Sequence, residues 1–171
     1  QRQATMQHTD LTDHFIIAMP GLQDQNFDHS VTYICEHDEN GCFGLIINKQ
    51  TTLKMREIIS QMEIATTLGE DDDTPIYLGG PVQQDRGFIL HSPTGEWNAS
   101  RRINDSIALT TSKDILKAIA QDRGPQQSMV ALGYAGWGPG QLEREMAENS
   151  WLSCPADQQI IFHTPSDQRW Q

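Results

Sequence analysis

The sequence predicts an α+β domain with a mixed β-sheet. Predicted strands outnumber predicted helices by about two to one, and hairpins mix with helical crossovers, unlike a regular βαβ array. The 171-residue chain shows no internal repeat and no low-complexity linker. Because this length is usual for one domain, we expect residues 6–171 to form a single domain. Met6 is the expected start, and residues 1–5 are expected to be a remnant of expression or processing.

The first predicted strands lie in the N-terminal third of the chain. HFIIAMP at 14–20 is a short apolar run that predicts a buried strand. SVTYICE at 30–36 and CFGLIIN at 42–48 are rich in β-branched and aromatic residues. Asn40–Gly41 lies between them and is a strong turn signal, so these two segments are expected to form a hairpin.

Three segments predict helices. LKMREIISQM at 53–62 places apolar side chains near one helical face, and Thr52 is its expected N-cap. KDILKAIAQ at 113–121 has the same kind of periodicity. Leu142 and Met146, four residues apart, give the third predicted helix an apolar face.

The remaining predicted strands are short apolar runs bounded by glycine, proline or polar residues. They lie at 75–80, 86–92, 105–110, 128–135 and 159–165. The long polar stretch at 92–104 is expected to be a connection. The order of strands and helices therefore supports a mixed sheet with helical crossovers.

Charge narrows the range of partners. The chain has 23 acidic and 12 basic residues, which gives a formal net charge of −11. Binding to a nucleic-acid backbone relies on clustered lysine and arginine, whereas the tightest basic cluster here is Arg101–Arg102. Direct nucleic-acid binding and binding to acidic membranes are therefore disfavoured. An unidentified small polar ligand or a basic protein partner remains open, and the sequence leaves the oligomeric state undetermined.

The sequence favours a cytoplasmic protein. No apolar run approaches the roughly 20 residues of a membrane-spanning helix, and no signal-peptide pattern is visible. The three cysteines, Cys35, Cys42 and Cys154, form no CxxC pair and are expected to be reduced. Cys35 and Cys42 flank the predicted hairpin turn, where they could form a redox or metal pair, but buried, inert thiols are the favoured interpretation.

The segment GYAGWGPGQLEREM at 133–146 raises the question of a phosphate site. A nucleotide-binding loop of the Walker type requires lysine and serine or threonine after its last glycine, whereas Gln141 follows Gly140 here. Glu143 and Glu145 would also repel a phosphate at the start of the helix. We therefore expect the glycines to serve a turn between a strand and a helix.

Histidines at the ends of predicted strands are candidate metal ligands. His14, His91 and His163 come from three predicted strands, and they could meet at one rim of the sheet. Zinc-binding motifs such as HExxH are absent from the sequence. Hydrogen-bonded histidines are the favoured interpretation, so no metal, cofactor or catalytic residue is assigned.

Several segments together resemble the AlgH/YqgE family of bacterial proteins. They are HFIIAMP (14–20), SVTYICEHDENGCFGLIINK (30–49), YLGGPVQQDRGFILHS (77–92), LTTSKDILKAI (109–119), ALGYAGWGPGQLEREMAENSWL (131–152) and IIFHTPSDQRW (160–170). The resemblance implies a compact α+β fold with a barrel-like sheet surrounded by helices. It implies no reaction, although the family carries the label of transcriptional regulator. It also implies that a family C-terminal tail, which usually follows the RW motif, is absent after Gln171.

Polar and aromatic residues at strand ends and turns suggest one cleft for a small ligand or a peptide, because such sites combine an apolar wall with a few oriented polar groups. The candidate residues are Asn48, Lys49, Gly79, Gly80, Arg86, His91, Tyr134 and Trp137. The alternative is that the glycines serve turns and the aromatic residues serve the core.

The favoured function is that of a non-enzymatic regulatory, ligand-binding or partner-binding protein of the AlgH/YqgE type. It rests on the resemblance and on the lack of a recognisable catalytic motif. If the protein regulates transcription, its charge favours a protein partner or a ligand over direct DNA contact. The alternative is an enzyme with an unrecognised site near Lys49, Arg86 and His91. A third hypothesis is a scaffold that docks a partner through exposed tryptophans.

Overall fold

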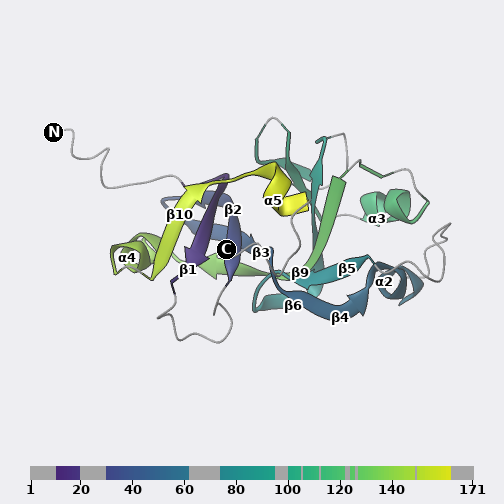
Figure 1. Ribbon diagram of the computed structural model, residues 1–171, viewed down its shortest axis with the longest axis horizontal. Helices are drawn as coiled ribbons and strands as arrows, with labels where there is room; N and C mark the ends of the chain where they lie inside the picture. Colours follow the sequence, from purple (N-terminus) through teal and green to yellow (C-terminus); the bar gives the residue numbers. More distant parts are fainter. Residues whose placement is uncertain are drawn as a thin grey trace.

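A strongly curled β-sheet organises the molecule (Figure 1). The computed structural model describes residues 11–19, 30–61, 74–94, 100–104, 106–111, 113–121, 124–125, 127–148 and 150–162. Within these ranges the main path of the sheet runs β10-β1-β2-β3-β9-β6-β8-β7. β5 joins it by pairing with β9, and β4 pairs with β5. The predicted α+β class is confirmed.

The described strands are antiparallel to their neighbours except for one pair. Their bounds are β1 (His14–Ala18), β2 (Val31–Asp38), β3 (Gly41–Ile46), β4 (Gln50–Lys54), β5 (Pro75–Leu78), β6 (Val82–Ser92), β7 (Ser100–Arg102), β8 (Ala108–Thr110), β9 (Gln127–Trp137) and β10 (Trp151–Pro155). β5 and β9 form the parallel pair, which makes the sheet mixed, as the sequence predicts.

The described helices are short. They are α2 (Met55–Gln61), α3 (Lys113–Ala120), α4 (Gln141–Ala147) and α5 (Gln158–Phe162). In Figure 1, α4 lies beside β10 and β1, whereas α2 and α3 lie together at the opposite end. No helix among the described residues is long and apolar enough to cross a membrane.

Three buried clusters follow this arrangement. Phe15, Tyr33 and Phe88 belong to the central cluster, which spans both halves of the sheet. A second cluster joins Trp137 to residues of β1, β2, α4 and β10. In the third, α2 and α3 pack their apolar faces against β5, β6 and β9. Burial of these faces explains why helices as short as 7 and 8 residues persist.

The predicted hairpin is confirmed, with a small shift of its turn. β2 and β3 pair from Thr32↔Ile46 to Asp38↔Gly41, so Glu39 and Asn40 form the two-residue loop. The backbone N–H of Asn40 donates to Asp38 Oδ1 at 2.8 Å. Gly41 follows the loop with φ 139°, in the region that favours glycine.

Two predictions about the first helix were wrong. Residues 50–54 form β4, so the helix begins at Met55 rather than at 53, and Thr52 is not its N-cap. The start is fixed instead by Glu57, whose Oε1 accepts the backbone N–H of Lys54 at 3.0 Å. This contact is the glutamate half of a capping box, in which the glutamate lies three residues after the N-cap position.

The predicted strand at 159–165 was also wrong. Residues Gln158–Phe162 form α5. The Asp157 carbonyl accepts the backbone N–H groups of Ile160 and Ile161 at 3.0 and 3.3 Å, closing a helical turn. An apolar run this short has no distinguishing period, and Ile161 is buried in the helix. Residues 163–165 lie outside the described residues.

Short edge strands account for the other differences. β7 lies within the stretch predicted as a polar connection, and β10 was not predicted. Among the described strands, each pairs on one side only: β7 with the following strand β8, and β10 with the distant β1. β6 and β9 are also longer than predicted, beginning at Val82 and ending at Trp137. Pairing with distant strands extends these elements beyond what local propensity indicates.

Close backbone packing holds β9 against the segment that enters β6. Gly133 in β9 has φ 79°, and a Cβ added there would overlap the carbonyl oxygen of Gly80. A Cβ at Gly80 would overlap the backbone of Tyr134. Gly140 has a similar φ of 72°, at the N-cap of α4, but nothing lies within 4 Å of its missing Cβ.

We expect Gly133→Ala to destabilise the protein far more than Gly140→Ala. Both substitutions place alanine in the left-handed region, which costs about 1–2 kcal/mol. Only the first adds a backbone overlap, so it should lower the free energy of unfolding by about 3 kcal/mol or more. Urea denaturation measures both values, and equal losses would contradict the close-packing account.

Candidate functional site

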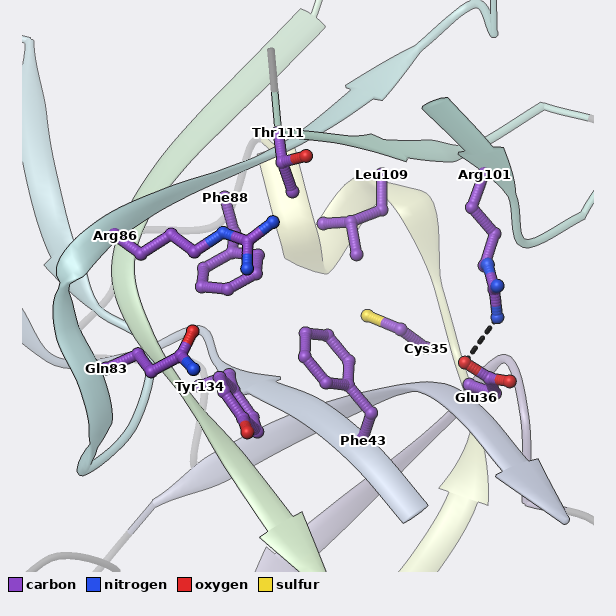
Figure 2. A pocket seen from close by; sticks show the side chains of 10 residues that line it. All are labelled: Cys35, Glu36, Phe43, Gln83, Arg86, Phe88, Arg101, Leu109, Thr111 and Tyr134. Carbon is purple, nitrogen blue, oxygen red and sulfur yellow. Dashed lines mark ion pairs between the residues drawn. The ribbon is translucent and has the colours of Figure 1, made fainter. Parts of the chain in front are cut away.

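A pocket of about 320 Å³ opens on the sheet where β2, β3, β6, β8 and β9 converge (Figure 2). We call it the arginine–aromatic pocket. It is lined by Cys35, Glu36, Phe43, Gln83, Arg86, Phe88, Arg101, Leu109, Thr111 and Tyr134. Its volume lies at the lower end of the roughly 300–1,000 Å³ of small-ligand sites.

Three aromatic rings from three strands form one wall of the pocket. Phe43 stacks on Tyr134 with 4.6 Å between ring centroids and 24° between planes. Phe88 meets both rings edge-on, at 5.5 Å from Phe43 and 5.7 Å from Tyr134. Gly136 lies opposite Phe43 in the β3–β9 ladder. A Cβ at Gly136 would lie 3.3 Å from the Tyr134 ring, so glycine leaves room for the stack.

Two arginines lie on opposite sides of these rings (Figure 2). The Arg86 guanidinium carbon is 5.5 Å from the centroid of the Phe88 ring, within reach of a cation–π interaction. Arg101 instead forms an ion pair with Glu36, in which both side chains are about half exposed. No acidic side chain among the described residues is recorded in an ion pair with Arg86, so its charge is open to a ligand.

Irregular backbone shapes the rim. The ladder between β6 and β9 breaks between Val82 and Gly87, and Gln83 within that break has φ 50°, unusual for a residue with a side chain. The break carries Gln83 and Arg86 to the pocket. Such bulges re-aim side chains and often lie next to binding sites.

Cys35 is the extra residue of a second bulge, between Ile34 and Glu36 of β2. Figure 2 shows its sulfur directed into the pocket, yet the residue is only 3% exposed. Burial is the main cause that raises the pKa of the Cys35 thiol well above its ordinary range, and the nearby Cys42 and Glu36 raise it further. The thiol therefore stays protonated, which agrees with the prediction of buried, inert cysteines.

A more open pocket of about 630 Å³ adjoins the first and shares Glu36, Phe43 and Tyr134 with it. We call it the acidic pocket, because Glu36 and Asp38 both line it. Trp137 closes one side. Its indole Nε1–H donates to Glu145 Oε1 at 3.0 Å, and Trp151 donates to the same oxygen at 2.9 Å.

Three of the predicted site residues line these pockets. Arg86 lines the arginine–aromatic pocket, Trp137 lines the acidic pocket, and Tyr134 lines both. Trp137 is buried, whereas Tyr134 is half-buried. Trp137 therefore packs in a core cluster and also borders a pocket.

The structure places four other candidate residues away from the linings of both pockets. Asn48 Oδ1 accepts the backbone N–H of Val31 at 2.9 Å. The Lys49 carbonyl accepts the backbone N–H of Leu78 at 2.8 Å. Gly79 and Gly80 provide the close approach to β9. These contacts give each of the four a role in holding strands together.

His91 is fully buried and belongs to a hydrogen-bonded chain. Its Nδ1 lies 3.0 Å from the Pro93 carbonyl, which can only accept, so Nδ1 carries the proton. Its Nε2 therefore accepts from Thr110 Oγ1 at 2.7 Å, and Ser100 Oγ lies 2.9 Å from Thr110 Oγ1. Burial lowers the pKa of His91 below 6.5, which keeps the ring neutral.

The metal and phosphate hypotheses receive no structural support in the described ranges. No group of three or more histidine, cysteine and acidic side chains lies close enough to hold a metal ion in the described part of the chain. His163 lies outside it. At the glycine loop, the Gly138 N–H already donates to Gln141 Oε1 at 3.0 Å. The glycines at 133 and 140 serve positive-φ backbone, as predicted.

Five residues that line the arginine–aromatic pocket were not predicted from the sequence as site residues, namely Glu36, Phe43, Gln83, Phe88 and Arg101. In sequence, Phe43 and Phe88 look like ordinary core positions of apolar strands. The available signal was the spacing of Arg86 and Phe88, since side chains two apart share one face of a strand. Arg101 comes from the stretch predicted as a connection, so its pairing could not be anticipated.

Comparisons with known proteins agree with this fold. A family model described as AlgH-like matches residues 15–171. A UPF0301 protein of Thioalkalivibrio sulfidiphilus is 52% identical over 163 residues, which are 95% of this chain and 87% of that protein. A UPF0301 protein of Nitrosococcus oceani is 49% identical over 159 residues, 93% of this chain and 85% of that protein. The chain belongs to the AlgH-like family.

Two solved structures share the architecture. The solution structure of the AlgH protein from Pseudomonas aeruginosa has a TM-score of 0.82 and 44% identity, over 94% of this chain and 85% of that one. A crystal structure of a protein from Corynebacterium diphtheriae has a TM-score of 0.76 at 19% identity, over 95% and 85%. The second likeness shows the fold alone.

The lowered pKa of His91 predicts a loss of stability in acid. As pH falls below about 6.5, the unfolded chain binds the proton first, so the free energy of unfolding falls until the folded pKa is reached. For this one proton the slope approaches about 1.4 kcal/mol per pH unit. Urea denaturation at several pH values, with His91→Gln alongside, measures the effect. An unchanged difference between the two proteins across that range would contradict the assignment.

Proposed function

We propose that this member of the AlgH-like family is a non-enzymatic, regulatory binding protein, and that the arginine–aromatic pocket holds its ligand. The observation that carries the proposal is the Arg86 guanidinium beside the Phe43, Phe88 and Tyr134 rings. A ligand with a flat apolar body and an anionic group would complement both features. The pocket volume of about 320 Å³ suits a small group of this kind.

The chemistry around the pocket supports binding rather than catalysis. Cys35 is the nucleophilic side chain directed into it, but burial raises its pKa and keeps the sulfur uncharged. His91, one of the three residues named in the alternative enzyme hypothesis, uses both ring nitrogens inside the protein. It also lies an odd number of residues from Phe88 in a regular ladder, so the two side chains face opposite sides of β6.

A regulatory role would run through a ligand or a protein partner. The net charge of −11 opposes contact with DNA phosphates, and screening weakens this repulsion only beyond about 8 Å at physiological salt. A transcriptional effect, if the protein has one, is therefore proposed to be indirect. Tight, salt-sensitive retardation of DNA in a gel shift would contradict this part of the proposal.

We expect naphthoate, a flat ring with one carboxylate, to bind in the arginine–aromatic pocket. In ¹⁵N-labelled protein, amide shifts should move at residues of β3, β6 and β9 around Phe43, Arg86 and Tyr134. Arg86→Gln should weaken binding roughly fivefold, the value of about 1 kcal/mol for a partly exposed ion pair.

Arg102→Gln is the matched control. Arg102 is an exposed arginine of β7 that lines neither pocket, so its loss changes net charge equally without touching the site. If both variants weakened naphthoate binding equally, the effect would come from overall charge and not from the pocket. Amide shifts confined to other surfaces would refute the pocket as the ligand site.

A further inference from the structure

We propose that the arginine–aromatic pocket and the acidic pocket together bind the carboxy-terminal end of a peptide. Its last residue would be aromatic, and a basic residue would lie two or three positions upstream. The inference rests on the proposed binding function and names its ligand class. It follows from the opposite charges at the two ends of the joined pockets and from the rings between them.

The first end of the joined pockets is cationic. Arg86 lies beside Phe88, and no ion pair with another described residue occupies it. A carboxylate, like a phosphate, is an anion that the planar guanidinium can bind with two parallel hydrogen bonds, and a peptide carries one at its C-terminus. This pocket holds only about 320 Å³, which is room for about one residue and suits the last residue of a chain.

The second end is acidic. Glu36 is already paired with Arg101, which leaves Asp38 as the acid open to a ligand. Asp38 is exposed, and its Oδ1 accepts the Asn40 N–H at 2.8 Å. No basic side chain of the described segments is recorded in an ion pair with it. A lysine or arginine of the ligand would find its partner there.

The stacked rings of Phe43 and Tyr134 connect the two ends, since both residues line both pockets. An aromatic side chain of the ligand can join this stack at one of its edges or faces. The rings therefore favour an aromatic residue beside the terminal carboxylate.

The separation of the two charged ends favours a peptide over a single amino acid. Asp38 lies on β2 and Arg86 on β6, and β3 and β9 lie between them. Three inter-strand steps of about 4.8 Å give a path of about 14 Å along the curved sheet. An extended chain covers about 3.3 Å per residue, so about four residues bridge the two ends.

The overall charge of the protein also favours a ligand that carries both signs. A purely anionic ligand would approach Arg86 against a net charge of −11. A basic residue upstream offsets that repulsion and adds an attraction at Asp38.

The test uses the peptide acetyl-lysyl-glycyl-glycyl-phenylalanine with a free carboxylate, titrated calorimetrically into the full chain. Two matched peptides replace the carboxylate by an amide or the lysine by norleucine. We expect each change to weaken binding by the wild type roughly fivefold. The Arg86→Gln variant should bind the peptide acid and the peptide amide with equal affinity. The Asp38→Asn variant should bind the lysine and norleucine peptides with equal affinity. Asparagine keeps the oxygen that accepts the Asn40 N–H, so the turn is retained.

Three outcomes would overturn the inference. The first is that the peptide does not bind. The second is that Arg86→Gln still prefers the acid to the amide, or that Asp38→Asn still prefers lysine to norleucine. The third is that N-acetylphenylalanine, which reaches only the first pocket, binds as tightly as the peptide. Each is distinguishable from failure of the proposed function, because naphthoate would still shift the resonances around Arg86 if the pocket binds ligands at all. Arg102→Gln, the control variant, should retain both discriminations.

Discussion

The backbone contact between Gly133 of β9 and Gly80, just before β6, is the constraint on which the rest of the structure depends. Neither position has room for a Cβ, and Gly133 adopts φ 79°. The contact lets β9 pair with β3 at one end and with β5 and β6 at the other. One strand thereby links both halves of the curled sheet (Figure 1). The entry of β6 is pressed against β9 at this point, and its ladder breaks between Val82 and Gly87.

That break gives the pocket its chemistry. It brings Arg86 to the side of Phe88, while the regular ladders hold Phe43, Phe88 and Tyr134 in contact. The reactive groups nearby are restrained: the Cys35 thiol is kept protonated by burial, and His91 is held neutral on the other face of β6. The proposed ligand-binding function rests on this exposed cation, the aromatic wall and the lack of charge on the nearby thiol and imidazole.

The sequence was most informative where local rules decide the structure. The hairpin at Asn40–Gly41 and the turn glycines at 133 and 140 follow from backbone chemistry that a few residues determine. It was least informative at β10, which pairs with the distant β1, and at α5, where a short apolar run has no distinguishing period. Arg86, Tyr134 and Trp137 could be singled out because charged and aromatic residues near turns stand out. Phe43 could not, because only the fold shows which face of a strand borders a pocket, and the one signal for Phe88 was its spacing from Arg86.

The most direct test of the central claim is a crystal structure of the protein grown with naphthoate. The account predicts electron density for the ring against Phe43 and Tyr134, with its carboxylate at the Arg86 guanidinium. Density for the ligand at another surface, with the arginine–aromatic pocket empty at a saturating concentration, would contradict it.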